Sequence, residues 1–353
     1  MTLADLGYND ALARVRNEGG LERFEVGRVT AEHKERYVVR TVDGEVIAEV
    51  SGNLRAAARD RLDFPAVGDW VALMVHEPGH ATIHQVFPRT SVITRKAIGV
   101  FGGTQVIAAN IDHAFLVQAA DRDFNINRLE RYLTICHGAG VRPIILLTKT
   151  DLIDARQVVE MEERIRARIA NVPIIALSNV IKDGCDAVRR CIVKGKTYCL
   201  LGSSGVGKTT LLNNLMGRPA MRTGSISDST SKGRHITSHR ELAVLDGGGI
   251  IIDNPGMREV GITDAEGGLE ATFGRITELA RECRFTDCTH TTEIGCAVLA
   301  AVHRGELDEA SMANYQKMKS EASHFQATVA TRRKKDKEFG KMVKRYKKDM
   351  GKM

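Results

Sequence analysis

Short stretches of alternating apolar and polar residues dominate the first part of the chain. Between residues 23 and 86 this period of two predicts five strands, at residues 25–29, 37–42, 45–50, 69–75 and 82–86. An Asp43-Gly44 pair between two of them is typical of a hairpin turn. Five short strands in this space favour a closed barrel of the OB type, a frequent platform for nucleic acids. An SH3-like barrel and a plain structural module remain alternatives.

Further along the chain, apolar strands alternate with amphipathic helices, which is typical of a parallel sheet covered on both faces. Strands are expected at residues 114–118, 143–147, 173–177 and 197–201, and helices at 127–137, 155–170, 183–194 and 208–216. Two last strands, at 241–245 and 249–253, are joined by Gly247-Gly248 and are expected to form an antiparallel hairpin.

The changes of pattern predict three domains. Residues 1–88 are expected to form an OB-fold barrel with an N-terminal extension, and residues 89–265 an α/β domain that follows a linker at Arg89-Thr90-Ser91. Beyond Gly267 helices are expected, so residues 266–353 form a third, helical domain. The length of 353 residues agrees with this division, at roughly 150 residues a domain.

Composition narrows the class of protein. The apolar runs are as short as Ile250-Ile251-Ile252, far below the roughly 20 residues that cross a bilayer, which argues against a membrane-spanning protein. Asp5 and Asp10 stand where a secretory signal carries positive charge and an apolar stretch. Seven cysteines, three of them within 14 residues, suit a metal in a reducing compartment better than disulfides. We therefore expect a cytoplasmic protein.

Positive charge is concentrated at the C-terminal end. Residues 331–353 contain 11 Lys and Arg against 3 Asp and Glu, a net charge of +8, whereas the rest of the chain carries −1. A basic segment of this kind favours a polyanion, and RNA is the expected partner in the cytoplasm. A solvated tail without a partner is the alternative.

A phosphate-binding loop follows the strand expected at 197–201. The pattern G-x4-G-K-T is formed by Gly202-Ser203-Ser204-Gly205-Val206-Gly207-Lys208-Thr209, and a helix opens with Thr210. The glycines let backbone N–H groups turn towards phosphates, Lys208 reaches the β- and γ-phosphates, and the Thr209 hydroxyl binds Mg²⁺. The strand and helix on either side make nucleotide binding the prediction for this segment.

Two further motifs lie at strand ends. Asp253-Asn254-Pro255-Gly256 offers a carboxylate for Mg²⁺ and a glycine N–H for the γ-phosphate. Thr148-Lys149-Thr150-Asp151 is a candidate base reader, because the Asp151 carboxylate accepts from N1–H and the 2-amino group of guanine but finds no such donors on adenine. The stem of Lys149 would cover the purine, and Ser178 would back it. GTP is therefore favoured over ATP.

The order of these motifs is unusual, because the base reader precedes the phosphate loop. A circular permutation produces this order without changing the sheet. With its barrel and Cys/His cluster, the chain resembles the RsgA (YjeQ) family of circularly permuted, ribosome-associated GTPases. The resemblance implies an N-terminal OB-fold, a central circularly permuted P-loop GTPase and a C-terminal zinc domain. It also implies a role in late maturation of the small ribosomal subunit, which stimulates GTP hydrolysis.

The segment 223–237 corresponds to switch I in this family. Gly233-Arg234-His235-Ile236-Thr237 keeps all but one position of the family signature G-R-H-T-T. The resemblance implies Thr237 as the switch ligand of Mg²⁺, with Ser238 as its rival, and His235 as the group that orients the attacking water. Met257 stands where many GTPases carry a glutamine for that task, and a thioether cannot perform it. A histidine that only packs in the loop is the alternative for His235.

Two residues depart from the usual motifs. Thr148 replaces the asparagine of the base reader, and Asn254 replaces a threonine between Asp253 and Pro255. We expect weaker nucleotide binding, with guanine selectivity retained through Asp151.

A cluster of metal-binding residues lies in the helical domain. Cys283, Cys288, His290 and Cys296 supply three thiolates and one imidazole within 14 residues. This set matches a closed, tetrahedral, structural Zn²⁺ site, with free core cysteines and a nearby histidine as the alternative. The remaining cysteines lack such spacing and are expected to be reduced core thiols.

Two functions are consistent with these motifs. The first is a monomeric GTP hydrolase that binds rRNA of the small ribosomal subunit in its GTP form and is released after hydrolysis. The second is a nucleotide-gated RNA-binding protein with little turnover. Met257, Thr148 and Asn254, which differ from the usual GTPase residues, are the reason to retain this alternative. A P-loop ATPase or nucleotide kinase is disfavoured by Asp151.

Overall fold

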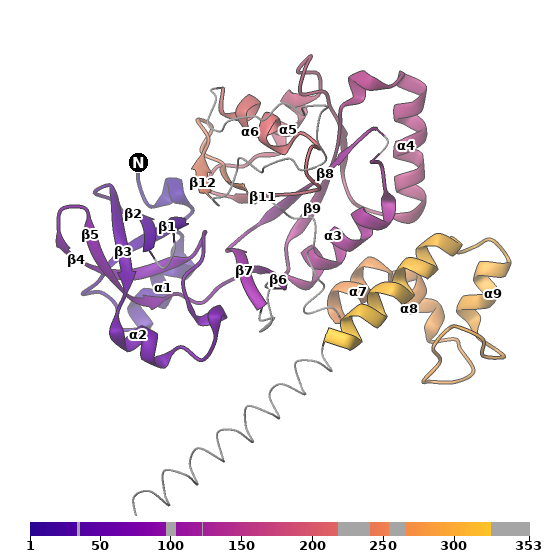
Figure 1. Cartoon of the computed structure of the whole chain (residues 1–353), viewed down its shortest axis with the longest axis horizontal. Coiled ribbons are helices and arrows are strands. Elements are labelled where there is room, and N and C mark those ends of the chain that lie inside the picture. The colour runs from indigo at the N-terminus through magenta and orange to yellow at the C-terminus, as the bar shows by residue number, and fades with distance from the viewer. Residues whose placement is uncertain (34–35, 97–103, 122, 218–240, 254–265, 326–353) are drawn as a thin grey trace, which may run out of the picture. The chain divides into compact units, whose positions relative to one another are not determined.

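The computed structural model describes residues 1–33, 36–96, 104–121, 123–217, 241–253 and 266–325 (Figure 1). The chain divides into two compact units, residues 1–261 and 262–353. The first unit contains a barrel and an α/β sheet, and the second is helical. Among the residues described, no helix is long and apolar enough to cross a membrane.

The N-terminal strands close into a five-stranded, OB-like barrel. Its strands are β1 (Glu25–His33), β2 (Arg36–Arg40), β3 (Glu45–Val50), β4 (Trp70–Glu77) and β5 (His80–Val86). They pair in the order β1-β2-β3-β5-β4, and β4 returns to β1. Along β3 the residues alternate between exposed and buried, so that Val46, Ala48 and Val50 fill the interior. The expected barrel is confirmed.

Two helices accompany the barrel. Helix α1 (Asp10–Glu18) begins at Asn9, whose side chain accepts hydrogen bonds from the amides of Ala11 and Leu12. Its Leu12 packs with Phe24 and Trp70 in a second core outside the barrel. Helix α2 (Gly52–Ala57) follows β3, and Ser51 caps it through the amide of Leu54. The short 3₁₀ turns are η1 (Ala4–Leu6) and η2 (Arg61–Asp63).

No strand is expected between residues 89 and 113 from the hydropathy pattern, yet this segment contains two. Strands β6 (Val92–Lys96) and β7 (Thr104–Ala109) form an antiparallel pair of their own. Arg89, expected in a linker, is anchored instead, because its guanidinium bonds the Asp69 carboxylate at 2.6 Å. Burial raises the pKa of Asp69, and Arg89 opposes that rise. Residues 89–91 have no regular secondary structure, as expected of a linker, but the ion pair fixes this connection between β5 and β6.

The central sheet is mainly parallel, as expected. Its strands β8 (His113–Ala119), β9 (Arg142–Thr148), β10 (Ile174–Ala176), β11 (Thr197–Leu201), β12 (Glu241–Val244) and β13 (Ile250–Asp253) stand in the order β10-β9-β8-β11-β13-β12. Only β12 is antiparallel to its sheet neighbour β13, which confirms the expected hairpin. From β8 the chain builds outward to β10, then returns to place β11 on the other side of β8. This reversal is the topological switch point at which open α/β sheets bind ligands.

Helices cover both faces of this sheet (Figure 1). On one face, α3 (Ile126–Gly138) and α4 (Ala155–Arg168) pack on alternate strand residues such as Leu116 and Ile145. On the other, α5 (Cys185–Cys191) and α6 (Lys208–Met216) pack on the residues between, such as Phe115 and Leu146. The alternation within single strands therefore builds two separate cores.

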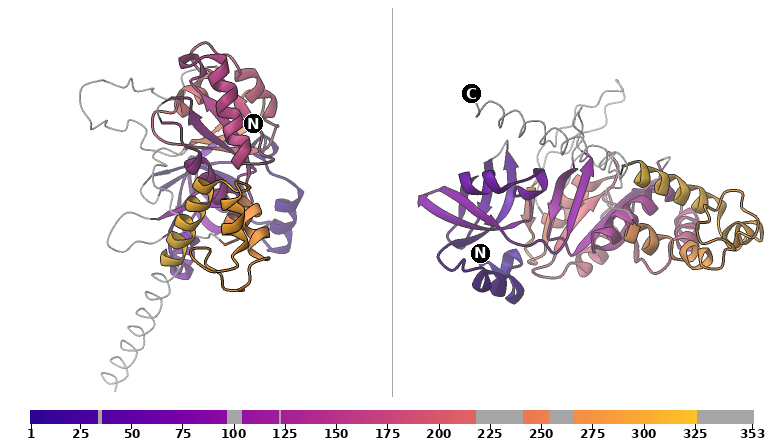
Figure 2. Two further views of the ribbon diagram at one scale, coloured as in Figure 1. Left: turned by 90° about the vertical axis from the view of Figure 1, so that its right-hand side faces the viewer. Right: turned by 90° about the horizontal axis from the view of Figure 1, so that it is seen from below.

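Barrel and central sheet lie side by side, as Figures 1 and 2 show, and β1 pairs with β12 at Ala31 and Glu241. A buried guanidinium joins them. Arg28 of β1 donates to the carbonyls of Leu6 (2.6 Å), Gly68 (3.1 Å) and Asn110 (3.2 Å), and to the Thr197 hydroxyl (2.9 Å). Burial lowers the pKa of Arg28 to about 10, against the charges of Asp112 and Asp69, so the group stays charged at neutral pH.

The second unit is built from helices α7 (Glu266–Thr272), α8 (Gly274–Ala280) and α9 (Ala297–His303) and a helix over 309–325. Its core includes Phe273, Ile276, Val298 and Met318. Between α8 and α9 lies a long irregular segment that contains the Cys/His cluster.

We expect Arg28→Met to destabilise the barrel by about 3 kcal/mol or more, because four acceptors, three of them in buried hydrogen bonds, lose their charged donor. Urea unfolding followed by the fluorescence of Trp70, the single tryptophan and 5.4 Å from the guanidinium, measures this directly. The matched control is Arg36→Met, whose arginine is 70% exposed in an ion pair with Glu49 and should change stability by less than about 0.5 kcal/mol. Equal effects of the two variants would contradict the role given to Arg28.

Candidate nucleotide-binding site

The phosphate loop lies at the switch point, between the end of β11 and the start of α6. Gly202 lies against β8, where an added Cβ would be 2.4 Å from the carbonyl oxygen of Val117. Gly207 has φ of 94°, a conformation that favours glycine. Lys208 is buried, and its Nζ donates to the carbonyls of Gly202 (2.8 Å) and Ser203 (2.7 Å). The loop has the compact form that surrounds phosphate groups.

The candidate base reader lies at the same edge of the sheet, because β9 is parallel to β8 and ends beside it. Thr148 is fully buried, and its hydroxyl donates to the Val206 carbonyl of the phosphate loop at 2.7 Å. Thr148, which replaces the usual asparagine, thus joins the two loops. Lys149 adopts φ of 60°, and the chain then enters the 3₁₀ turn η3 (Thr150–Leu152), which contains Asp151.

The Ser178 loop contacts the base reader. Ser178 follows β10, is fully buried, and donates from Oγ to Asp151 Oδ1 at 2.5 Å. The same Oγ accepts from the amides of Val180 and Ile181. The carboxylate proposed to read guanine therefore has one oxygen fixed by the residue expected to back the base.

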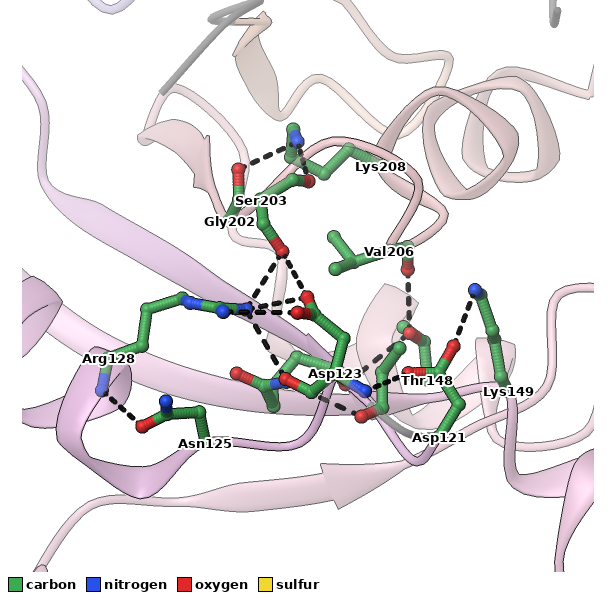
Figure 3. A network of polar contacts seen from close by, with 12 residues as sticks. Asp121, Asp123, Asn125, Arg128, Thr148, Lys149, Gly202, Ser203, Val206 and Lys208 are labelled. Atoms are coloured by element: carbon green, nitrogen blue, oxygen red, sulfur yellow. Dashed lines mark hydrogen bonds and ion pairs between the residues drawn. The ribbon is translucent and has the colours of Figure 1, made fainter. Parts of the chain in front are cut away.

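Three charged side chains that were not identified from the sequence, Asp121, Asp123 and Arg128, lie next to the phosphate loop on the side of β8. Figure 3 shows Asp121 and Asp123, which follow that strand, beside Lys149, Arg128 and Ser203. Lys149 Nζ lies 2.8 Å from Asp121, and Arg128 lies 2.6 Å from Asp123. The Ser203 hydroxyl donates to Asp123 (2.7 Å) and accepts from Arg128 (3.1 Å). The signal was present in the chain, since both carboxylates follow a parallel strand that borders the switch point.

These charges change the pKa values of the group. Burial alone would raise the pKa of Asp121, but the hydrogen bond and charge of Lys149 outweigh it, so that the pKa is lowered. The hydrogen bond to Asp123 raises the pKa of Arg128. Both shifts favour the charged forms of Asp121 and Arg128 at neutral pH. They border a cavity of about 470 Å³ that is also lined by Ala119, Tyr132 and the loop residues 203–206.

Asp253 and Thr209 are the candidate oxygen ligands of a magnesium ion. Asp253 is buried at the end of β13, which pairs with β11 so that Cys199 is opposite Ile252. Thr209 is the second residue of α6. A carboxylate and a hydroxyl are the type of ligand that Mg²⁺ takes, and the two residues fit this ion by their chemistry. His235, Thr237 and Ser238, with Asn254, Gly256 and Met257, lie outside the described residues, as does the basic tail 331–353.

The second unit brings Cys283, Cys288, His290 and Cys296 together, with their ligand atoms within 4.8 Å of one another. Cys283 Sγ lies 3.8 Å from Cys296 Sγ and 3.6 Å from His290 Nδ1, and Nδ1 lies 3.4 Å from Cys296 Sγ. A tetrahedral zinc ion separates two sulfurs by about 3.8 Å and a sulfur from a nitrogen by about 3.6 Å. Burial lowers the pKa of His290, which favours the neutral imidazole that binds metals. The cluster is compatible with a zinc site.

Comparison with known proteins agrees with this site. A family model described as RsgA GTPase matches residues 86–263. The chain is 41% identical over 334 residues to the small ribosomal subunit biogenesis GTPase RsgA of Opitutus terrae, over 92% of this chain and 90% of the relative. The crystal structure of YjeQ from Thermotoga maritima is similar, with a TM-score of 0.63 and 25% identity over 84% of this chain and 98% of that one. YloQ, a circularly permuted GTPase, shares the fold at a TM-score of 0.60 and 24% identity, over 86% and 96% of the two chains.

We expect the purified protein to contain about one zinc per chain, and Cys296→Ser to reduce this to well below half. Atomic absorption of protein purified under reducing conditions measures the metal. The matched control is Cys191→Ser, which removes a half-buried thiol of α5 outside the cluster and should leave the zinc content unchanged. Zinc that survives in Cys296→Ser, or is absent from the unchanged chain, would contradict the site.

Proposed function

Because this chain belongs to the RsgA family of GTPases, we propose that it hydrolyses GTP while it assists maturation of the small ribosomal subunit. The observation that carries nucleotide binding is the contact between Thr148 and the Val206 carbonyl. It holds the residues suited to guanine and those suited to phosphates at one edge of one sheet. The relatives named small ribosomal subunit biogenesis GTPase support the choice of partner.

In this proposal the phosphates of GTP bind the loop of residues 202–209. Its N–H groups, with that of Thr210 at the start of α6, face the negative charge, and Lys208 Nζ moves to the β- and γ-phosphates. Thr209 and Asp253 would hold Mg²⁺, with Thr237 as a third ligand. The ion supplies neutralisation of the charge that develops on the phosphates.

The base would lie on Lys149 and face Asp151. The carboxylate accepts from N1–H and the 2-amino group of guanine, whereas adenine would leave it desolvated without a donor. Lys149 is suited to covering the base, because the Asp121 carboxylate fixes its ammonium. Thr148 and Asn254, which replace the usual residues, are expected to weaken binding without changing this selectivity.

Hydrolysis needs a group that orients water, and Met257 cannot be that group. We propose His235, whose imidazole can accept from water, and we place the γ-phosphate contact on the N–H of Gly256. Both residues belong to switch segments that GTP would order, so the nucleotide would control which surface binds RNA.

The remaining parts would hold the ribosomal partner. We propose that residues 1–88, 89–265 and 266–353 act as an rRNA-binding barrel, a GTPase and a zinc-containing domain of a cytoplasmic monomer. The basic segment 331–353 would contact rRNA through its net charge of +8, and this contact should weaken as salt increases.

We expect GTP hydrolysis by the protein alone to be slow and to rise about 100-fold or more with purified small ribosomal subunits. ATP should not replace GTP, and Lys208→Ala should abolish the stimulated rate. Phosphate release with and without subunits measures both. Lys194→Ala, in which the exposed ammonium is paired with Asp5 away from the loop, is the matched control and should keep the full rate.

If saturating subunits leave the rate unchanged while RNA binding still depends on the nucleotide, the protein is a nucleotide-gated RNA binder. Equal use of ATP would contradict the role of Asp151.

A separate substitution tests the base reader. Asp151→Asn should reduce GTP affinity about 100-fold or more and increase affinity for xanthosine triphosphate, because the amide can donate to its 2-oxo group while still accepting from N1–H. Direct titration with the two nucleotides measures the reversal. Asp186→Asn, in which an exposed aspartate of α5 is changed, should leave both affinities as they are. If Asp151→Asn lowers the affinities for both nucleotides by the same factor, base reading by this residue is contradicted.

A further inference from the structure

Asn179 lies between the base-reading loops and the phosphate loop. It directly follows Ser178, its exposed fraction is 9%, and its Nδ2 donates to the carbonyl oxygen of Gly207 at 3.1 Å. A carbonyl oxygen can only accept, so the end of the amide that faces Gly207 must be the nitrogen. An added Cβ at Gly207 would lie 2.8 Å from this Nδ2, which shows how closely the two residues approach.

Helix α6 holds Asn179 from the other side. Asn214 Nδ2 donates to the main-chain carbonyl of Asn179 at 2.9 Å and to its side-chain Oδ1 at 3.5 Å. The orientation of Asn179 is therefore determined from two sides, by an acceptor in the phosphate loop and by a donor from the helix that follows it.

The bond to Gly207 bears on phosphate binding through the geometry of one peptide. The Gly207 carbonyl and the Lys208 N–H belong to the same planar, trans peptide group and point in opposite directions. The carbonyl accepts from Asn179 and from the Leu211 amide (2.9 Å), so its direction is fixed. The Lys208 N–H then points into the loop, where such groups face bound phosphates.

Adjacent residues of one loop thus serve the two ends of the site. Ser178 bonds the Asp151 carboxylate, and Asn179 bonds the phosphate loop. We propose that Asn179 is a positioning residue for the nucleotide phosphates, which holds the peptide between Gly207 and Lys208 in its binding orientation. The proposal rests on the function proposed above, and it gives Asn179 no part in reading the base.

Two diphosphates separate the roles of Ser178 and Asn179. Guanosine and inosine diphosphate carry the same phosphates, and inosine lacks only the 2-amino group that Asp151 would accept from. Asn179→Asp keeps the shape but places an oxygen against the Gly207 carbonyl. We expect it to weaken binding of both nucleotides by the same factor, about 10-fold or more, and Asn179→Ala to weaken both equally but less.

Ser178→Ala is the matched control at the next position. It releases Asp151, so it should weaken guanosine diphosphate more than inosine diphosphate and lower the ratio of the two affinities. Binding of each nucleotide with Mg²⁺ is measured by titration calorimetry on the full chain, at a temperature where circular dichroism shows every variant folded. A role in folding alone would leave the affinities of the folded protein unchanged.

The inference is overturned if the wild type binds guanosine diphosphate and both Asn179 variants bind it within twofold of the same affinity. It is also overturned if Asn179→Asp changes the ratio of the two nucleotides as Ser178→Ala does, because Asn179 would then act on the base. A wild type that binds neither nucleotide overturns the proposed function, and the role of Asn179 with it.

Discussion

The structure depends on one constraint of parallel sheets, which is that all strands of one direction end at the same edge. Strand β8 has β9 on one side and β11 on the other, so the segments after β8, β9 and β11 meet although they are far apart in the chain. These segments are the acidic pair at 121 and 123, the candidate base reader at 148–151 and the phosphate loop. The same edge would form from any starting point in the cyclic order of strands. A permuted chain therefore keeps the nucleotide site of its family.

At that edge of the sheet, buried polar groups of one loop form hydrogen bonds with groups of another loop. A phosphate loop directs its N–H groups inward, so its carbonyls turn outward and need donors. Thr148 supplies one for Val206 and Asn179 supplies one for Gly207, both from the loops proposed to flank the base. Loss of the Thr148 donor would cost roughly 1–3 kcal/mol at the Val206 carbonyl, which favours the closed arrangement of the loops, whereas the Gly207 carbonyl would still accept from the Leu211 amide. Binding energy for phosphates is then not spent on ordering the loop.

The barrel is joined to this sheet where β11 begins, five residues before the phosphate loop. Arg28 spans the junction, and its four acceptors come from η1, from the turn before β4, from the end of β7 and from β11. A guanidinium without a carboxylate bonded to it is tolerated here because all three of its nitrogens donate to a carbonyl or a hydroxyl, in four hydrogen bonds. The contact links the barrel to the strand that leads into the nucleotide site.

Much of this protein can be predicted from the order of its residues, because the signals are local. Alternation along residues 45–50 predicts a strand with one buried face, the run at 202–209 predicts a phosphate loop between a strand and a helix, and four metal-binding residues within 14 predict a cluster. Each of these needs only neighbouring positions. The pair β6–β7, the anchoring of Arg89 by Asp69, the burial of Arg28 and the bond from Asn179 to Gly207 have no such local signal. The hydrogen bonds of Arg89, Arg28 and Asn179 join positions 20 to 169 residues apart, and only the folded chain decides which buried donor meets which acceptor.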